Sequence, residues 1–99
     1  RAINFAIRLD GKCIGEVLLY RFDGKGGAEE GCRIAPEYGG QGYGAEAFRA
    51  VAEWGLYDRH LSHIVAKCYK ENTASYQMLS SCMRKKGEDE KFFYFNKEV

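Results

Sequence analysis

The sequence predicts one α/β domain, with a mixed and mostly antiparallel sheet that contains one parallel strand–helix–strand crossover. The first observation is length, because the 99 residues suffice for one hydrophobic core and no second. The second is a run of strand-like segments joined by tight turns, which only antiparallel neighbours allow. The third is that helical segments then alternate with strands, which is typical of a right-handed crossover between parallel strands.

The chain opens directly in a strand pattern. Phe5, Ile7 and Leu9 alternate with smaller or polar residues, which is the period of a half-buried strand. Asp10-Gly11 then supplies the residues of a tight hairpin turn. Because no methionine precedes this strand, we expect a natural N-terminal part to be missing from the sequence.

Two more strands complete an antiparallel meander. The second is expected over Lys12–Phe22, where apolar residues on both faces indicate a central strand covered on both sides. A turn over Asp23–Gly27 leads to the third strand at Ala28–Ala35. Pro36 ends that strand because proline cannot donate to a sheet ladder.

The second half of the chain alternates helices and strands. Apolar residues at helical spacing predict one helix from about Gly44 to Asp58 and another over Asn72–Met83. A strand over Ser62–Tyr69 lies between them. Arg84–Glu90 is interpreted as a charged connector, and the aromatic segment Lys91–Val99 as a buried final strand and not a base-stacking platform.

Composition excludes several classes of partner. A net charge of +1 favours neither nucleic acid nor an anionic membrane, and no apolar segment is long enough to span a bilayer. The four cysteines, which show no CxxC spacing, are Cys13, Cys32, Cys68 and Cys82. We expect them to be reduced thiols of a cytoplasmic protein. His60 and His63 have no cysteine pair beside them, so we expect no metal site.

Four glycines, Gly39, Gly40, Gly42 and Gly44, precede the first helix. The unpaired N–H groups of a helix start bind anions, and glycines let a phosphate approach them. A mononucleotide P-loop is excluded because Ala45 stands where that loop needs lysine. A dinucleotide fingerprint is formally met, although the chain is too short for paired nucleotide-binding halves. The structural alternative to a phosphate-binding loop is a connector in which the glycines serve only to let the chain turn sharply.

The segment GGQGYGAEA resembles the pyrophosphate loop of the GNAT superfamily of N-acetyltransferases, whose pattern is (Q/R)xxGx(G/A). Gly42 and Gly44 match its last positions, whereas Gly39 stands where the family has Gln or Arg. The preceding AEEGCRIAPEY resembles the fourth strand of that fold, whose exposed backbone pairs with the pantetheine arm. The resemblance implies a set of residues that bind acetyl-CoA: Ile34, Ala35, Gly39, Gly40, Gln41, Gly42, Tyr43, Gly44, Ala45, Asn72 and Ser75.

A second motif supports the same family. ENTASYQML resembles the NxxSxxxL motif of the ribosomal-protein N-alpha-acetyltransferase branch, whose asparagine hydrogen-bonds the pantetheine; here it is Asn72. Asparagine is also a good helix N-cap, and one residue can serve both roles. Met83 replaces the glycine that usually ends this helix, and Leu79 replaces the tyrosine that many members use as general acid.

The resemblance implies the GNAT acyl-CoA N-acyltransferase fold without its first strand and first two helices. It implies acetyl transfer from acetyl-CoA, as co-substrate and without a metal, to a primary amine of a protein N-terminus or a small molecule. The amine would attack directly in a ternary complex. The alternative is a non-catalytic acyl-CoA-binding or oligomerising fragment. The oligomeric state stays open, and the free sheet edge is one that a second copy of the chain could cover in a homodimer.

Three side chains are candidates for catalysis. Glu30, on the same strand face as Cys32 and opposite Glu29, is the expected general base, unless it is a solvated edge carboxylate. The family likeness implies Ser75 as proton donor, whereas a structural serine would bond a preceding carbonyl. Tyr76 is the alternative donor, unless it packs in the core.

Overall fold

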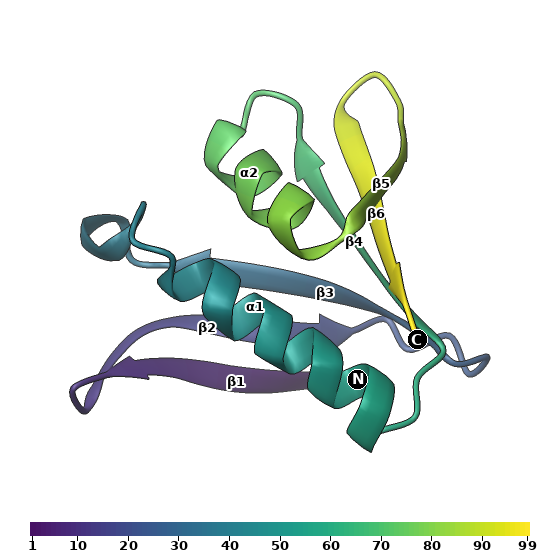
Figure 1. The fold of residues 1–99 in the computed structure, drawn as a ribbon, viewed down its shortest axis with the longest axis horizontal. Coiled ribbons are helices and arrows are strands. Elements are labelled where there is room, and N and C mark those ends of the chain that lie inside the picture. The colour runs from purple at the N-terminus through teal and green to yellow at the C-terminus, as the bar shows by residue number, and fades with distance from the viewer.

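The computed structural model describes residues 1–99 as six strands and two α-helices (Figure 1). A short 3-10 turn, η1, precedes helix α1, and a π-helical turn, η2, follows it. The bounds are β1 Ala2–Leu9, β2 Lys12–Tyr20, β3 Gly27–Ile34, η1 Pro36–Tyr38, α1 Tyr43–Glu53, η2 Trp54–Asp58, β4 His63–Tyr69, α2 Thr73–Cys82, β5 Arg84–Glu88 and β6 Phe92–Glu98.

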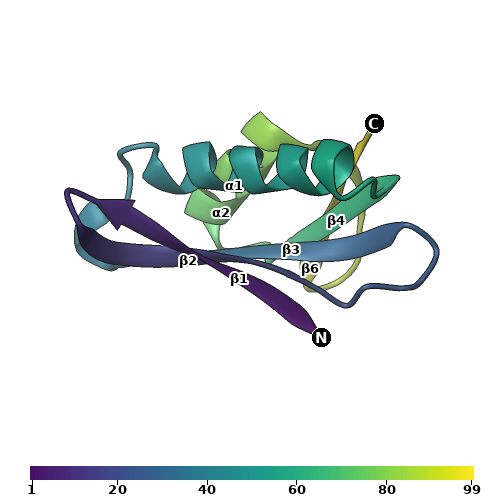
Figure 2. The ribbon, with the colours of Figure 1, turned by 90° about the horizontal axis from the view of Figure 1, so that it is seen from below.

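The strands form one sheet in the order β1-β2-β3-β4-β6-β5. Every neighbouring pair is antiparallel except β3 and β4, which are parallel and joined through α1. Both helices lie on the same face of this sheet (Figure 2). The predicted fold class, a mixed and mostly antiparallel sheet with one parallel crossover, is therefore confirmed. Neither helix has the length and apolar character that crossing a membrane requires.

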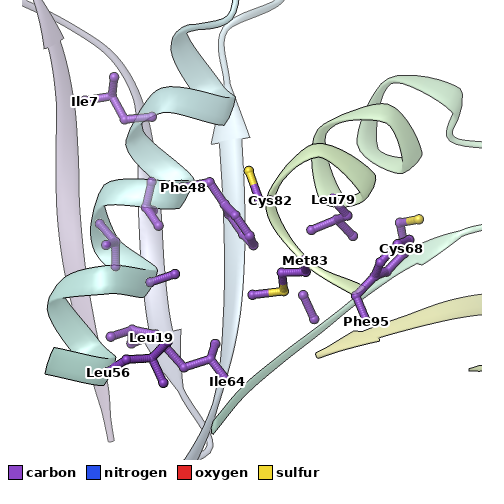
Figure 3. Packing of buried hydrophobic residues seen from close by; sticks show 14 of the residues in the cluster. Ile7, Leu19, Phe48, Leu56, Ile64, Cys68, Leu79, Cys82, Met83 and Phe95 are labelled. Atoms are coloured by element: carbon purple, nitrogen blue, oxygen red, sulfur yellow. The ribbon is translucent and has the colours of Figure 1, made fainter. Parts of the chain in front are cut away.

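The core lies between the helices and one face of the sheet (Figure 3). Val17 and Leu19 of β2 face the helices and are fully buried. Leu18 and Tyr20 alternate with them and are only half-buried, because no helix of this chain covers the other face. The prediction that this strand is covered on both sides is wrong for residues 1–99: apolar residues on both faces do not tell which face the helices will cover.

The predicted first helix is an α-helix only in its first part. α1 ends at Glu53, and the chain continues as the π-turn η2. This wider turn lays Gly55 against the core, where a Cβ would lie 3.1 Å from Ile64 Cδ1 and 3.3 Å from Leu19 Cδ1. Hydrophobic spacing over five residues cannot separate an α-turn from a π-turn, so the sequence did not reveal it.

The charged segment Arg84–Glu90 is not a connector, as predicted, because Arg84–Glu88 forms β5 and pairs with β6. Ladder hydrogen bonds need only the backbone, and an edge strand keeps its charged side chains in solvent. Glu88 forms ion pairs with Lys70 (3.0 Å) and Lys85 (2.9 Å). This strand could not be predicted from alternating apolar and polar residues, because its side chains are nearly all charged.

The parallel strands β3 and β4 separate soon after they meet (Figure 1). They pair only from Gly27↔His63 to Glu29↔Val65. Beyond Glu29, β3 still pairs with β2 as far as Ile34, and β4 pairs with β6 as far as Tyr69. Each strand thus has one unpaired edge facing a V-shaped gap, and this gap positions the candidate site.

Candidate functional site

A groove of about 560 Å³ lies between the end of β3, the glycine loop with the start of α1, and the first turns of α2. The structure brings together in this groove nine of the residues predicted to bind the cofactor: Ile34, Gly39, Gly40, Gly42, Tyr43, Gly44, Ala45, Asn72 and Ser75. Ala35 and Gln41 do not line it. The N–H of Ala35 donates instead to the carbonyl of Ile14 at 2.8 Å.

The glycine loop leaves a run of main-chain donors without partners. The first helical hydrogen bond of α1 runs from Glu46 N–H to the Gly42 carbonyl, at 3.0 Å. None of the N–H groups from Gly40 to Ala45 donates to an acceptor within the chain. Such a run at a helix start, where the helix dipole is positive, is suited to binding an anion.

Two glycines give the loop its shape. Gly40 has a φ of +73° and Gly42, the N-cap of α1, a φ of +86°, a region that favours glycine. A Cβ on either would meet no atom within 4 Å, so glycine is required here by conformation and not by crowding. Gly39 has an ordinary extended φ of −70° and is exposed. A Cβ at this position would lie 3.3 Å from the carbonyl oxygen of Pro36, a tight contact, so the side chain that the family pattern has here needs a small shift of the backbone.

The start of α2 forms the opposite wall of the groove. Asn72 is the N-cap, and its Oδ1 accepts a hydrogen bond from Ser75 N–H at 3.0 Å. The predicted capping role is confirmed, while Asn72 Nδ2 donates to no group within the chain. The Ser75 hydroxyl is also unengaged, unlike that of Ser81, which bonds the Met78 carbonyl at 2.7 Å. Both Asn72 Nδ2 and the Ser75 hydroxyl are free to bind a ligand.

Tyr76 does not line the groove. Its ring packs edge to face against Phe93 at 5.0 Å and against Phe95 at 5.9 Å. Successive helix residues are about 100° apart around the axis, so Ser75 and Tyr76 face different neighbours. The alternative that the sequence left open, a tyrosine packed against the core, is what the structure contains.

Glu30 is a buried carboxyl and not a solvated one. Its side chain is 2% exposed, and neither carboxyl oxygen has a hydrogen-bond partner. Burial raises the pKa of Glu30 to about 9, and the positive charge of Lys97 opposes the shift. Glu30 therefore carries a proton at neutral pH. It follows directly after the last β3–β4 pair and lines neither the groove nor the second cavity described next.

Glu29, which was not predicted to be functional, lines a second cavity of about 580 Å³ together with His63, Val65 and Lys67. Val65 and Lys67 are the exposed residues that alternate with the buried ones of β4, so this cavity lies on the sheet face away from the helices. Alternation placed Glu29 on the face opposite Glu30, without telling which face the helices cover. The importance of Glu29 becomes evident only once β3 and β4 are seen to separate at this residue.

Two side chains hold the Glu29 carboxylate. The Tyr20 hydroxyl donates to Oε2 at 3.0 Å, and Arg21 Nη1 forms an ion pair with Oε1 at 3.0 Å. Burial and the bond to Glu29 raise the pKa of Tyr20, so its hydroxyl stays protonated as a donor. A carboxylate fixed at the wall of a cavity can accept a proton from a ligand there.

No three His, Cys, Asp or Glu side chains are grouped so that they could hold a metal ion. All four cysteines are free. Cys32 lines the groove, but burial raises its pKa to about 11, so it remains a thiol and a weak nucleophile.

Comparison with known proteins identifies the family. Residues 1–82 match the model of an acetyltransferase (GNAT) domain. The uncharacterized N-acetyltransferase YnaD of Bacillus subtilis is 35% identical over 75 residues, which are 75% of this chain and 44% of YnaD. The chain thus spans less than half the length of this curated relative.

Solved structures share the fold. A GNAT-family acetyltransferase from Bacillus anthracis is 26% identical, with a TM-score of 0.90 over 96% of this chain and 65% of its own. The ribosomal-protein-S5-alanine acetyltransferase from Vibrio fischeri is 22% identical (TM-score 0.81; 90% of this chain, 56% of its own). Campylobacter jejuni PseH, solved with acetyl coenzyme A, is 17% identical (TM-score 0.81; 98% and 67%). The family model and the YnaD match, on this fold, show that the chain belongs to the GNAT family of acetyltransferases.

Proposed function

We propose that this protein transfers an acetyl group from acetyl-CoA to a primary amine, by direct attack of the amine in a ternary complex. The observation that carries the proposal is the run of unpartnered N–H groups from Gly40 to Ala45 at the wall of the groove. The diphosphate of acetyl-CoA is an anion of the kind that such a helix start binds. Family membership and the acetyl-CoA complex of PseH support the choice of ligand.

The rest of the groove suits the pantetheine arm. The arm contains amides, which need donors and acceptors, and β3 has an unpaired backbone edge from Glu30 to Ile34. Asn72 Nδ2, on the opposite wall, is a further donor. We infer that the arm follows β3 inward, and that the thioester reaches the point where β3 and β4 separate.

The chemistry then needs a base and an acid. The neutral amine nitrogen attacks the thioester carbonyl carbon; the N–C bond forms, the C–S bond breaks, and the sulfur leaves as a thiolate. We assign the base to Glu29, which takes the proton that the nitrogen loses, because Glu30 is already protonated. The Ser75 hydroxyl gives a proton to the thiolate and regains one from water.

The acceptor is a primary amine, on a protein N-terminus or a small molecule. We propose that it enters through the cavity of Glu29, where carboxylates from Glu29 and Glu98 favour a cationic group.

The four free cysteines support the cytoplasmic location that the sequence predicts. A homodimer through the free edge of β1, which has a neighbour on one side only, remains a prediction.

One observation favours a second function, a non-catalytic acyl-CoA-binding protein. Gly39 lacks the side chain that the family pattern provides beside the diphosphate. Calorimetric titration with acetyl-CoA and with desulfo-CoA measures binding, and release of free thiol with a panel of amines measures catalysis. Saturable binding with thiol release supports the acetyltransferase. Binding without release supports the second function, and no saturable binding rejects both.

A matched pair of variants tests the loop itself. Gly40 has a positive φ, which Asn and Asp tolerate better than other residues, and its Cβ position is open. Gly40→Asp adds a negative charge among the donors and should weaken acetyl-CoA binding at least tenfold, about 1.4 kcal/mol. Gly40→Asn has the same shape without the charge and should stay within about threefold of wild type. Equal effects of the two variants would contradict an anion site.

A further inference from the structure

The Glu30 carboxyl is the one buried side chain whose polar atoms lack any partner. Buried polar groups are almost always hydrogen-bonded, so an unpaired carboxyl requires an explanation. The protein does not provide a partner: Tyr20 and Arg21 bind Glu29, on the other face of the sheet. A ligand group is therefore the candidate hydrogen-bond partner of the Glu30 carboxyl.

The position of Glu30 identifies which part of a ligand could reach it. On β3, Ile34, Cys32 and Glu30 share the face toward the helices. Ile34 and Cys32 line the groove, and Glu30, which does not line it, is the next residue of this face beyond Cys32, toward the point where β3 and β4 separate. Ile34 Cδ1 would lie 4.0 Å from a Cβ on Gly44, so this end of β3 adjoins the phosphate loop. Four residues of strand span about 13 Å from there to Glu30.

That span matches the donor substrate. The chain from the phosphate of a pantetheine to its sulfur has about a dozen bonds and extends roughly 15 Å, judging from standard bond lengths. An arm that begins at the loop and follows β3 thus brings its thioester, rather than its amides, to the level of Glu30. This is also where β3 and β4 separate and where Glu29 faces the second cavity.

We propose that the Glu30 carboxyl donates a hydrogen bond to the carbonyl oxygen of the acetyl thioester. This inference rests on the proposed function. When the amine nitrogen attacks, the N–C bond forms and the carbonyl electron pair moves onto the oxygen, toward the Glu30 O–H. The pair returns as the C–S bond breaks, and the Glu30 proton stays on Glu30 throughout. Glu29 takes the proton from nitrogen, so the two carboxyl groups have separate roles.

Two facts separate this role from that of a base. The raised pKa keeps Glu30 in the form that can donate. A base must reach the amine, but Glu30 lies on the helix side of the sheet and Glu29 on the cavity side. A neutral acid buried in an apolar site is an effective hydrogen-bond donor to a developing oxyanion, because no water competes.

Matched variants test the proposal. Glu30→Gln keeps the size and an N–H donor but cannot titrate, and Glu30→Leu keeps the size without a donor. We expect Glu30→Gln to retain kcat within about threefold and Glu30→Leu to lose roughly 10²- to 10³-fold, the loss typical of one oxyanion donor. Glu29→Gln is the control for the base, and it should lose activity despite an intact Glu30.

A second readout does not depend on turnover. The infrared stretch of carbonyl-¹³C-labelled acetyl-CoA bound to the protein reports a hydrogen bond to that oxygen. The stretch should lie lower in wild type and Glu30→Gln than in Glu30→Leu, with Kd for CoA alone unchanged in all three. An equal loss of kcat in Glu30→Gln and Glu30→Leu, or a stretch unaffected by Glu30→Leu, would overturn the proposal. If wild type binds no acetyl-CoA at all, the proposed function fails instead, and this inference fails with it.

Discussion

The buried Glu30 carboxyl should make the stability of this protein depend on pH. Its pKa is about 9 in the folded chain, against an ordinary value of 4.5 in the unfolded chain. Between these two pH values the folded chain holds a proton that the unfolded chain has released. The free energy of unfolding therefore falls as pH rises. The stabilising contribution is complete below about pH 4.5 and is lost by about pH 9.

The size of the effect follows from the shift. Each pH unit within this range changes the free energy of unfolding by about 1.4 kcal/mol, or about 4 kcal/mol from pH 5 to pH 8. Two other titratable groups act at this position. Lys97 opposes the shift through its positive charge, and Cys32, with a pKa of about 11, stays neutral over the range. A loss of this size is a large part of the roughly 5–15 kcal/mol typical of a folded protein.

Urea unfolding of wild type and Glu30→Gln at pH 5, 6.5 and 8 measures this effect. The amide does not titrate, so the difference between the two proteins isolates Glu30 from all other groups. We expect this difference to change by about 4 kcal/mol in favour of the variant between pH 5 and pH 8. Parallel pH dependences of the two proteins would refute the reasoning, since Glu30 would then have the same pKa in both states.

Two further predictions concern the groove. Gly39→Arg restores the family residue at an exposed position of ordinary φ, and it should tighten acetyl-CoA binding about three- to tenfold through a charge-assisted hydrogen bond. The control variant Gly39→Ala should not tighten binding. Equal affinities of the two variants for acetyl-CoA, measured by calorimetry, would count against a diphosphate at this position. Ser75→Ala should lower kcat for thiol release by about tenfold or more, whereas Tyr76→Phe, which keeps the ring packing, should change it less than threefold. The reverse order would make Tyr76 the proton donor.

Local signals in the sequence were sufficient for most of the fold. The alternation of Phe5, Ile7 and Leu9, with the Asp10-Gly11 turn, predicts the first hairpin, and β1 and β2 form it. Asn72 at a helix start predicts a cap, and Asn72 caps α2. These features depend on residues a few positions apart, which is why sequence reasoning reaches them.

Features that depend on distant contacts were missed. β5 consists of charged residues at a sheet edge, where the backbone pairs with β6 and no hydrophobic pattern is needed. The roles of Glu29 and Glu30 depend on where β3 and β4 separate and on which face the helices cover. Strand alternation placed these two side chains on opposite faces correctly. It could not tell which of them faces a cavity and which is buried.

The central claim is that the main-chain donors of the glycine loop bind the diphosphate of acetyl-CoA. A titration of the ¹⁵N-labelled 11.2 kDa chain with acetyl-CoA, followed by amide chemical shifts, tests it most directly. The account predicts saturable shifts that are largest for the amides of residues 40–45, with smaller ones at the start of α2. Saturable binding that leaves the amides of residues 40–45 unmoved would contradict it.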